Sequence, residues 1–431
     1  MILSLEVKQA RKGDCLLLHY GTDADRHLLL IDGGPKKVYA RSLKPRLLQL
    51  AGPAGAGLIV DVLMVSHVDD DHIQGILDLT KEERDAMLDG KPRLLNVLSL
   101  WHNSYDDLIG SKADKVVETV TEHLGEAGLK GMIPDDRIDE ILESSDTDDA
   151  EVIEAGIGVL ASIPQGHKLR DDAEFLSWGL NVEVGGGTIA ASSDELALDG
   201  ELEIKVVGPL PDELAAFKKK YDEWLLEKAK GQKNAVAQLA SYVDESVTNL
   251  SSIVVIVTVG AKNILLTGDA RGDKILEGLE KIDVLKKGGT MEVDILKVPH
   301  HGSSNNLDTG FFERILADHY VFSGDGEHGN PERETLEMLF AARRVEKFTI
   351  HLTYEVSAID VERKKEWEKQ RLREIKNKSA KPSAPNPRPE WDHDLHSLTA
   401  LLAEPRTKNA TVAIVGPKRN HIIDLLDPVR Y

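Results

Sequence analysis

The segment from Leu58 to His72 constrains this chain more than any other. The apolar, β-branched run from Leu58 to Val65 is too short for a typical helix and predicts a buried strand. It is followed by Ser66 and then by two histidines and three aspartates within six residues. Buried carboxylates need a hydrogen-bonding partner or a cation. The segment therefore predicts a strand that leads into a metal-binding turn.

Other apolar runs end in the same way, with an aspartate or a histidine just after the run. Ile264–Thr267 is followed by Gly268-Asp269, and Val293–Val298 is followed by Pro299-His300-His301-Gly302-Ser303. Tyr320–Ser323 is followed by a loop that contains His328. Strands alternate with helical patterns, which favours an α/β fold. Because binding sites in such folds gather at one end of the strands, we expect these residues to converge.

The residue types in this set are those of a catalytic metal site. Imidazole and carboxylate ligands suit Zn²⁺, Mn²⁺ or Fe²⁺, and the lack of cysteine ligands argues against a purely structural zinc site. The turn from His67 to His72 is rich enough in ligands for two cations to share it. Asp269 is suited to bridge them, because a carboxylate has two oxygens. We therefore predict two divalent metal ions, Zn²⁺ or Mn²⁺, with Mg²⁺ as a further option.

Composition limits the partners and the compartment. The net charge of −21 does not favour nucleic acid globally, because phosphate binding depends on Lys and Arg. The segment 361–390 is the exception, with ten Lys or Arg and five Glu, and it could contact nucleic acid locally. No apolar stretch approaches the roughly 20 residues of a membrane span, and the start of the chain does not resemble a signal peptide. Cys15 is the single cysteine, so we predict a cytoplasmic protein without disulfides or membrane contact.

The order of these motifs resembles the metallo-β-lactamase superfamily. The motifs are Asp32-Gly33-Gly34, His67-x-Asp69-x-Asp71-His72, Gly268-Asp269 and His300-His301-Gly302-Ser303. More narrowly, they are similar to the ComEC-type hydrolase domain of bacterial competence DNA uptake. The resemblance implies a four-layer αββα sandwich, with metals at one edge. It also implies a ligand set: His67 and Asp69 for the first metal, Asp71, His72 and His301 for the second, and Asp269 as the bridge.

The resemblance also assigns the remaining candidate residues. Asp71 and His300 would act in catalysis, the first on the attacking water and the second on the charge that develops on the substrate. Asp32 would support the ligands from behind, while Ser303 and His328 would lie near the substrate. Asn249 stands where the superfamily commonly has a histidine, as does Asp69. Both changes replace nitrogen by oxygen, which moves the metal preference towards Mn²⁺ or Mg²⁺.

The domain organisation follows from the motif order. We predict a hydrolase core over residues 1–350, in which 81–199 is a mostly helical insertion. A basic, proline-containing linker or helix would occupy 351–390. Residues 391–431 would form a C-terminal helix–strand–strand segment that packs on the core.

Three functions agree with these features. The first is a phosphodiesterase or nuclease that uses a metal-activated hydroxide. The second is a carbonyl hydrolase with the same fold, acting on a lactone, a thioester or a β-lactam. The third is a metal-binding effector of a multi-protein system, such as a defence system, in which the basic tail recruits a partner protein. The oxygen-rich ligand set favours the first.

Overall fold

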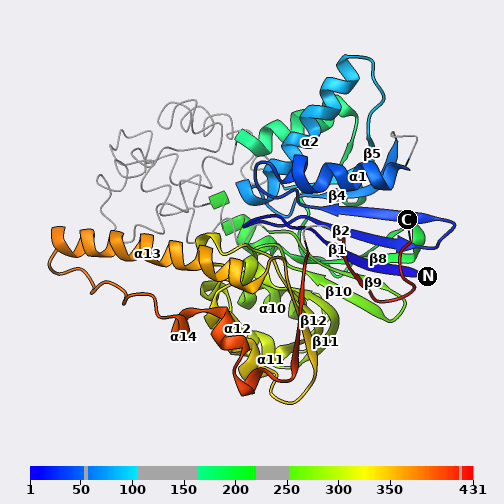
Figure 1. Ribbon diagram of the computed structural model, residues 1–431. Helices are drawn as coiled ribbons and strands as arrows, with labels where there is room; N and C mark the ends of the chain where they lie inside the picture. The colour runs from blue at the N-terminus through cyan, green and yellow to red at the C-terminus, as the bar shows by residue number, and fades with distance from the viewer. Residues whose placement is uncertain (53–56, 104–163, 217, 220–251, 417–419, 431) are drawn as a thin grey trace.

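Two mixed β-sheets form the centre of the molecule, and helices lie on their outer sides (Figure 1). The structure is a computed structural model that describes residues 1–52, 57–103, 164–216, 218–219, 252–416 and 420–430. The α/β class predicted from the sequence is confirmed. No helix in the described ranges is long and apolar enough to cross a lipid bilayer.

Among the described residues, the first sheet has seven strands in the spatial order β15-β1-β2-β3-β4-β5-β6. Its strands are β1 (Ile2–Val7), β2 (Leu16–Gly21), β3 (Arg26–Ile31), β4 (Leu58–Met64), β5 (Leu95–Trp101), β6 (Gly179–Leu180) and β15 (His421–Asp424). The strands from β15 to β3 pair antiparallel, and those from β3 to β6 pair parallel. Because β2 runs opposite to β3, the start of β2 lies at the same edge as the ends of β3 and β4.

In the part of the chain that the structure describes, the second sheet has eight strands in the spatial order β14-β13-β12-β11-β10-β9-β8-β7. Its strands are β7 (Glu195–Leu198), β8 (Leu202–Gly208), β9 (Val254–Val259), β10 (Lys262–Leu266), β11 (Met291–Lys297), β12 (Ile315–Phe322), β13 (Phe348–Leu352) and β14 (Ala410–Ile414). The strands from β10 to β14 are parallel. Their ends therefore share one edge of the sheet.

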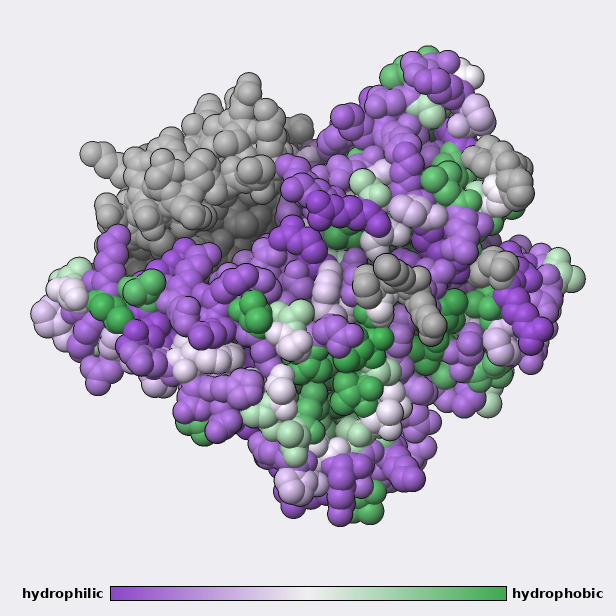
Figure 2. Space-filling model, viewed as in Figure 1, coloured by the Kyte–Doolittle hydropathy of each residue, from purple (hydrophilic) through white to green (hydrophobic). Residues whose placement is uncertain are grey.

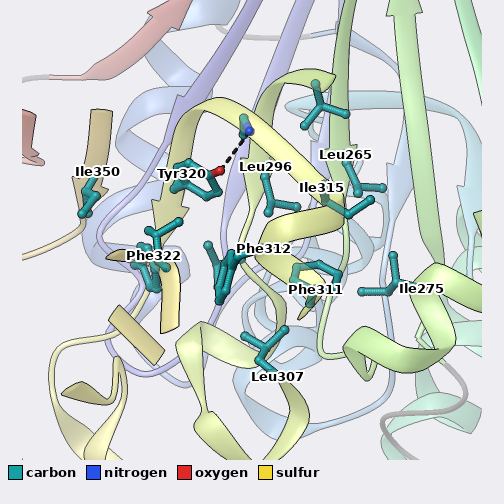
Figure 3. Packing of buried hydrophobic residues seen from close by; sticks show 14 of the residues in the cluster. Leu265, Ile275, Leu296, Leu307, Phe311, Phe312, Ile315, Tyr320, Phe322 and Ile350 are labelled. Carbon is teal, nitrogen blue, oxygen red and sulfur yellow. Dashed lines mark hydrogen bonds between the residues drawn. The ribbon is translucent and has the colours of Figure 1, made fainter. Parts of the chain in front are cut away.

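Three buried apolar clusters define the packing of these elements. One contains residues of both sheets, such as Leu18, Val62 and Ile264, so the sheets pack face to face. A second lies between the first sheet and the helices α1 (Lys44–Ala51), α2 (Asp70–Leu88) and 164–176. The third lies on the outer side of the second sheet (Figure 3). Both sheets are therefore covered on both faces, which explains why the central strands read as nearly continuous apolar runs.

The third cluster involves the helices of the C-terminal half. They are α10 (Gly272–Lys281), α11 (Thr309–Arg314), α12 (Arg333–Ala342), α13 (Val356–Ala380) and α15 (Leu398–Leu402), while the short α14 (His393–His396) contributes no residue to the cluster. Phe311 and Phe312 of α11 enter the cluster beside Tyr320 of β12 (Figure 3). The buried Tyr320 hydroxyl accepts a hydrogen bond from the Ala317 N–H at 3.0 Å. The polar tip of this aromatic ring is thus satisfied inside the apolar cluster.

The two sheets extend across the predicted domain organisation. Beside helical residues, the range predicted as a mostly helical insertion, 81–199, contributes the strands β5, β6 and β7. Within it, residues 104–163 lie outside the described residues. The boundary at residue 350 cuts through β13, which pairs with β14 on one side and β12 on the other. The C-terminal segment supplies β14 to the second sheet and β15 to the first, and thus contributes a strand to each.

The segment predicted as a linker or helix, 351–390, consists largely of the helix α13, followed by a proline-containing stretch. α13 extends from the body of the molecule (Figure 1), and its surface on the face shown in Figure 2 is mainly hydrophilic. Residues 381–390 return along it: Arg388 pairs with Glu374 at 2.6 Å, and the Trp367 indole donates to the Pro389 carbonyl at 2.8 Å. This proline-containing stretch is therefore docked on the helix and is not a free tether.

A chain of three histidines connects the second sheet to β15 of the first. His319 Nδ1 lies 2.9 Å from His351 Nε2, and His351 Nδ1 lies 2.7 Å from His421 Nε2. Each neutral ring can donate one hydrogen bond and accept another. Burial, together with the neighbouring histidines His421 and His319, lowers the pKa of His351 to about 3. The folded protein therefore keeps this ring neutral where the unfolded chain binds a proton.

We expect His351 to make the fold less stable in mild acid. Below about pH 6.5, the pKa of histidine in the unfolded chain, the unfolded state binds a proton at His351 that the folded state does not bind. The free energy of unfolding therefore falls as the pH is lowered towards about 3. One such group contributes a slope of up to about 1.4 kcal/mol per pH unit. Urea unfolding at pH 7 and pH 5 should show a smaller loss of stability for His351→Gln than for the wild type. An identical loss in both proteins would contradict this reading.

Candidate metal centre

The candidate site lies where the ends of strands from both sheets meet. β3 and β4 of the first sheet are parallel, as are β10 and β11 of the second, and the candidate residues lie in the loops after these strands. The backbone N–H of Ile253 donates to the carbonyl of Ser66 at 2.8 Å, and the N–H of His300 donates to the carbonyl of Gly268 at 3.1 Å. Residues from four separate segments of the chain are thus brought to one place.

Asp269 lies at the middle of this group. Its Oδ1 is 3.4 Å from His72 Nε2, and its Oδ2 is 3.4 Å from His301 Nε2. The Nε2 atoms of His67 and His300 each lie 3.7 Å from the same Oδ2. The side chain is almost fully buried. Both oxygens of one carboxylate therefore face imidazole nitrogens contributed by two other loops.

His67 faces Asp69 as well as Asp269. His67 Nε2 is 3.5 Å from Asp69 Oδ2. Asp69 is the N-cap residue of α2, with extended backbone angles, but its side chain makes no capping hydrogen bond. Its carboxylate is therefore left for another partner. The resemblance assigns this pair to the first metal.

Asp71 and His72 lie on the first turn of α2, and both face His301. His301 Nε2 is 3.6 Å from Asp71 Oδ2 and 3.3 Å from His72 Nε2. Two Nε2 atoms that face each other at this distance need a proton or a cation between them. Asp14, His72, Asp269 and His301 are all buried, and they present ligand atoms within 4.8 Å of one another that could hold a metal ion.

Several buried polar atoms of this group have no hydrogen-bond partner among the described residues. They are His67 Nε2, Asp69 Oδ1, Asp269 Oδ1 and His301 Nδ1. Leaving such atoms unpaired costs about 1–3 kcal/mol each. A cation would satisfy the first three, since these atoms belong to the predicted ligands. The donor set, imidazole nitrogens and carboxylate oxygens, fits a divalent metal ion.

Protonated histidines balance the charge of the buried carboxylates in this group. Burial lowers the pKa of His72, but Asp269 and Asp32 outweigh it and raise that pKa well above the usual value. His301 responds in the same way to Asp269 and Asp14. Burial opposes ionisation of Asp269, yet His301 and His72 hold its pKa well below the usual range. Metal binding would therefore release protons from these imidazoles.

Asp32 lies behind Ser66 and His72 and contacts both of them. Its Oδ1 accepts from the Ser66 N–H at 2.8 Å, and its Oδ2 accepts from the Ser66 hydroxyl at 2.7 Å. The same Oδ2 lies 2.8 Å from His72 Nδ1, which fixes the ring with Nε2 towards Asp269. A Cβ at Gly33 would collide with the backbone at Gly75 of α2, so this turn requires glycine for the close approach.

Asp14 is a buried member of the group that the sequence reading missed. It lies 3.6 Å from His301 Nδ1, accepts a short hydrogen bond from the Ser323 hydroxyl, and pairs with the buried Lys297 ammonium at 2.7 Å. Asp14 comes before a strand, whereas the site residues predicted from the sequence follow strands. The start of β2 reaches this edge because β2 is antiparallel to β3, and no local sequence signal marks that pairing.

The other predicted site residues have different surroundings. His300 and His301 both adopt left-handed backbone angles, with φ of 48° and 53°, and this turn directs the two rings differently. The side chain of His300 is 32% exposed, while His301 is buried. Ser303 is buried in the same turn and donates its N–H to the His300 carbonyl at 2.9 Å. His328 lies in the loop after β12, and Asn249 lies outside the described residues.

No protein-family model and no curated protein matches this chain. The resemblance to the metallo-β-lactamase superfamily therefore stays a prediction. It rests on the order of the motifs and on the side chains that these motifs bring together.

Proposed function

We propose that this chain is a metal-dependent phosphodiesterase of the metallo-β-lactamase superfamily, similar to the ComEC-type hydrolase domain. The observation that carries the proposal is Asp269, a buried carboxylate whose two oxygens face His67, His72 and His301. Two packed sheets with helices on their outer sides agree with the four-layer αββα sandwich of that superfamily. The extra strands β14 and β15 would be an elaboration of it.

Two cations fit the donor set. The first would be held by His67, Asp69 and Asp269, and the second by Asp71, His72, His301 and Asp269. Bound there, divalent cations lower the pKa of water and offset the negative charge of a phosphate. The mostly oxygen donors at the first position favour Mn²⁺ or Mg²⁺ over Zn²⁺.

Asp71 and His300 are the residues available to act on substrate. Burial opposes ionisation of Asp71, but the hydrogen bond from His301 and the charge of His72 keep the pKa of its carboxyl far below the usual range. The ionised Asp71 can accept a hydrogen bond from the attacking water and orient it. Burial lowers the pKa of His300, so its ring is neutral at pH 7. This partly exposed ring can donate a hydrogen bond to a phosphate oxygen.

The basic helix α13 offers less free charge than its composition suggests. Three of its lysines pair with glutamates of the same helix: Lys364 with Glu368, Lys365 with Glu362, and Lys369 with Glu366. Such exposed pairs contribute little to stability, but each partly offsets a positive charge. Binding of nucleic acid through residues 361–390, and recruitment of a partner protein by the same segment, stay predictions.

A substrate panel separates the proposed function from the carbonyl hydrolases. Purified protein supplied separately with Mn²⁺ and Zn²⁺ should hydrolyse bis-p-nitrophenyl phosphate. It should turn over p-nitrophenyl acetate and nitrocefin at least about a hundredfold more slowly, because a centre that stabilises phosphate charge gains little on a neutral carbonyl. Release of nitrophenolate and opening of nitrocefin are both followed by absorbance. Rapid hydrolysis of the esters or of nitrocefin, with no action on the diester, would contradict the proposal.

A further inference from the structure

The turn from Ala10 to Asp14 lies against the first turn of α2. A Cβ at Gly13 would overlap the carbonyl oxygen of Asp71, so this approach requires glycine. On the inner side of the turn, Asp14 is buried beside His301. Lys12, in contrast, has a side chain that is 24% exposed. The close contact at Gly13 therefore fixes a lysine at the rim of the candidate metal centre.

His328 reaches the same rim from the loop after β12. It lies in η7 (Glu327–Gly329) with a left-handed backbone, φ 59°, and its Nε2 is 2.9 Å from Lys12 Nζ. The loop is held in turn by α13, because Arg363 Nε donates to the Gly329 carbonyl at 3.0 Å. Lys12 and His328 thus contact each other at this rim. The loop of Lys12 is held by α2, and the loop of His328 is held by α13.

The positive charge of Lys12 is only partly offset. Glu327 pairs closely with Arg11, at 2.6 Å, and lies 3.9 Å from Lys12. Burial, together with Lys12, lowers the pKa of His328 to about 4. The His328 ring is therefore neutral at pH 7, and its Nε2 can accept a hydrogen bond from the ammonium.

We propose that Lys12, positioned by its hydrogen bond to His328, binds a non-bridging oxygen of the substrate phosphate. This inference rests on the proposed function and specifies its substrate class: an anionic phosphoryl compound. An ammonium carries three donors, of which His328 uses one, so two remain for a ligand. Lysine binds phosphate as a point charge, which tolerates the varied orientations of a diester. A neutral carbonyl substrate would gain much less from this charge.

Binding of inorganic phosphate tests the proposal directly. Full-length protein loaded with Mn²⁺ would be titrated with phosphate by calorimetry, as wild type, Lys12→Met and Lys91→Met. Methionine keeps most of the side-chain length and removes the charge, while Lys91 is an exposed residue beyond the far end of α2 that pairs with Asp89. We expect Lys12→Met to weaken phosphate binding about tenfold, the loss of one charge-assisted hydrogen bond, and Lys91→Met to leave it unchanged.

Turnover provides the second readout. In Lys12→Met the KM for bis-p-nitrophenyl phosphate should rise about tenfold while kcat changes less than about threefold. Equal phosphate affinity in Lys12→Met and wild type would overturn the proposal, as would wild-type protein that binds no phosphate. If Lys12 only ties the two loops together, Lys12→Met and His328→Ala would lower the melting temperature equally and leave phosphate affinity unchanged. Wild type that binds phosphate through Lys12 but cleaves no diester would overturn the proposed function alone.

Discussion

Replacing Asp269 by asparagine should abolish phosphodiester hydrolysis, with kcat/KM falling at least about a thousandfold. Asparagine has nearly the same volume, so the packing of the loop after β10 is preserved. It lacks the negative charge, however, and its NH₂ group cannot act as a metal ligand. The side chain would then offer one neutral oxygen to the cation at His72 and His301. It would offer no oxygen to the cation at His67 and Asp69. Metal analysis should show fewer ions bound to each chain than in the wild type.

The matched control for this variant is Asp273→Asn. Asp273 lies nearby on α10 but is on the surface, where it pairs with Arg271 at 3.0 Å. The Asp273→Asn variant should retain wild-type activity and metal content. Circular dichroism and the denaturation midpoint would establish that Asp269→Asn is folded. A folded Asp269→Asn protein with full activity and full metal content would rule out the bridging role.

Removal of metal should destabilise the protein by several kcal/mol. The buried group contains polar atoms without partners in the described structure, among them His67 Nε2 and Asp69 Oδ1. A ligand that binds only the folded state stabilises it by about 4 kcal/mol when present at a thousand times its Kd. We therefore expect a chelator to lower the melting temperature by at least about 5 °C, and added Mn²⁺ to restore it. The effect should be larger at pH 8 than at pH 6, because His72 and His301 must lose protons to bind metal.

Asp269→Asn again provides the control, since its melting temperature should respond much less to chelator. Differential scanning calorimetry with and without chelator measures both proteins. An equal effect of chelator on the two would place the stabilising metal elsewhere. No effect on the wild type, with metal shown to be present and removed, would contradict the account of the buried group.

The parts of the site that lie close together in the chain could be predicted from the sequence. The strand before Ser66 and the ligands from His67 to His72 form one continuous pattern, and α2 positions Asp71 and His72 on a single turn. Asp269 and His301 were identifiable because each follows a parallel strand, β10 or β11. The common edge of parallel strands then brings these loops together.

The parts that depend on long-range pairing could not be predicted in the same way. Asp14 joins the group because β2 is antiparallel to β3, and Lys297 is buried because Asp14 pairs with it. Lys297 lies inside an apolar strand, and nothing local indicates its partner. β13 was missed because Phe348–Leu352 is short, contains His351, and obtains its burial from β12 and β14 on either side. The C-terminal strands β14 and β15 likewise join different sheets through pairing with strands far away in the chain, which the local sequence does not indicate.

The rate of bis-p-nitrophenyl phosphate hydrolysis, measured as Mn²⁺ is titrated into chelator-treated protein, tests the central claim most directly. If Asp269 joins two metal positions, the rate should remain low at the first equivalent and reach its maximum at two equivalents per chain. A protein that binds two equivalents and still cleaves no diester, or one that is fully active with no metal bound, would contradict the account.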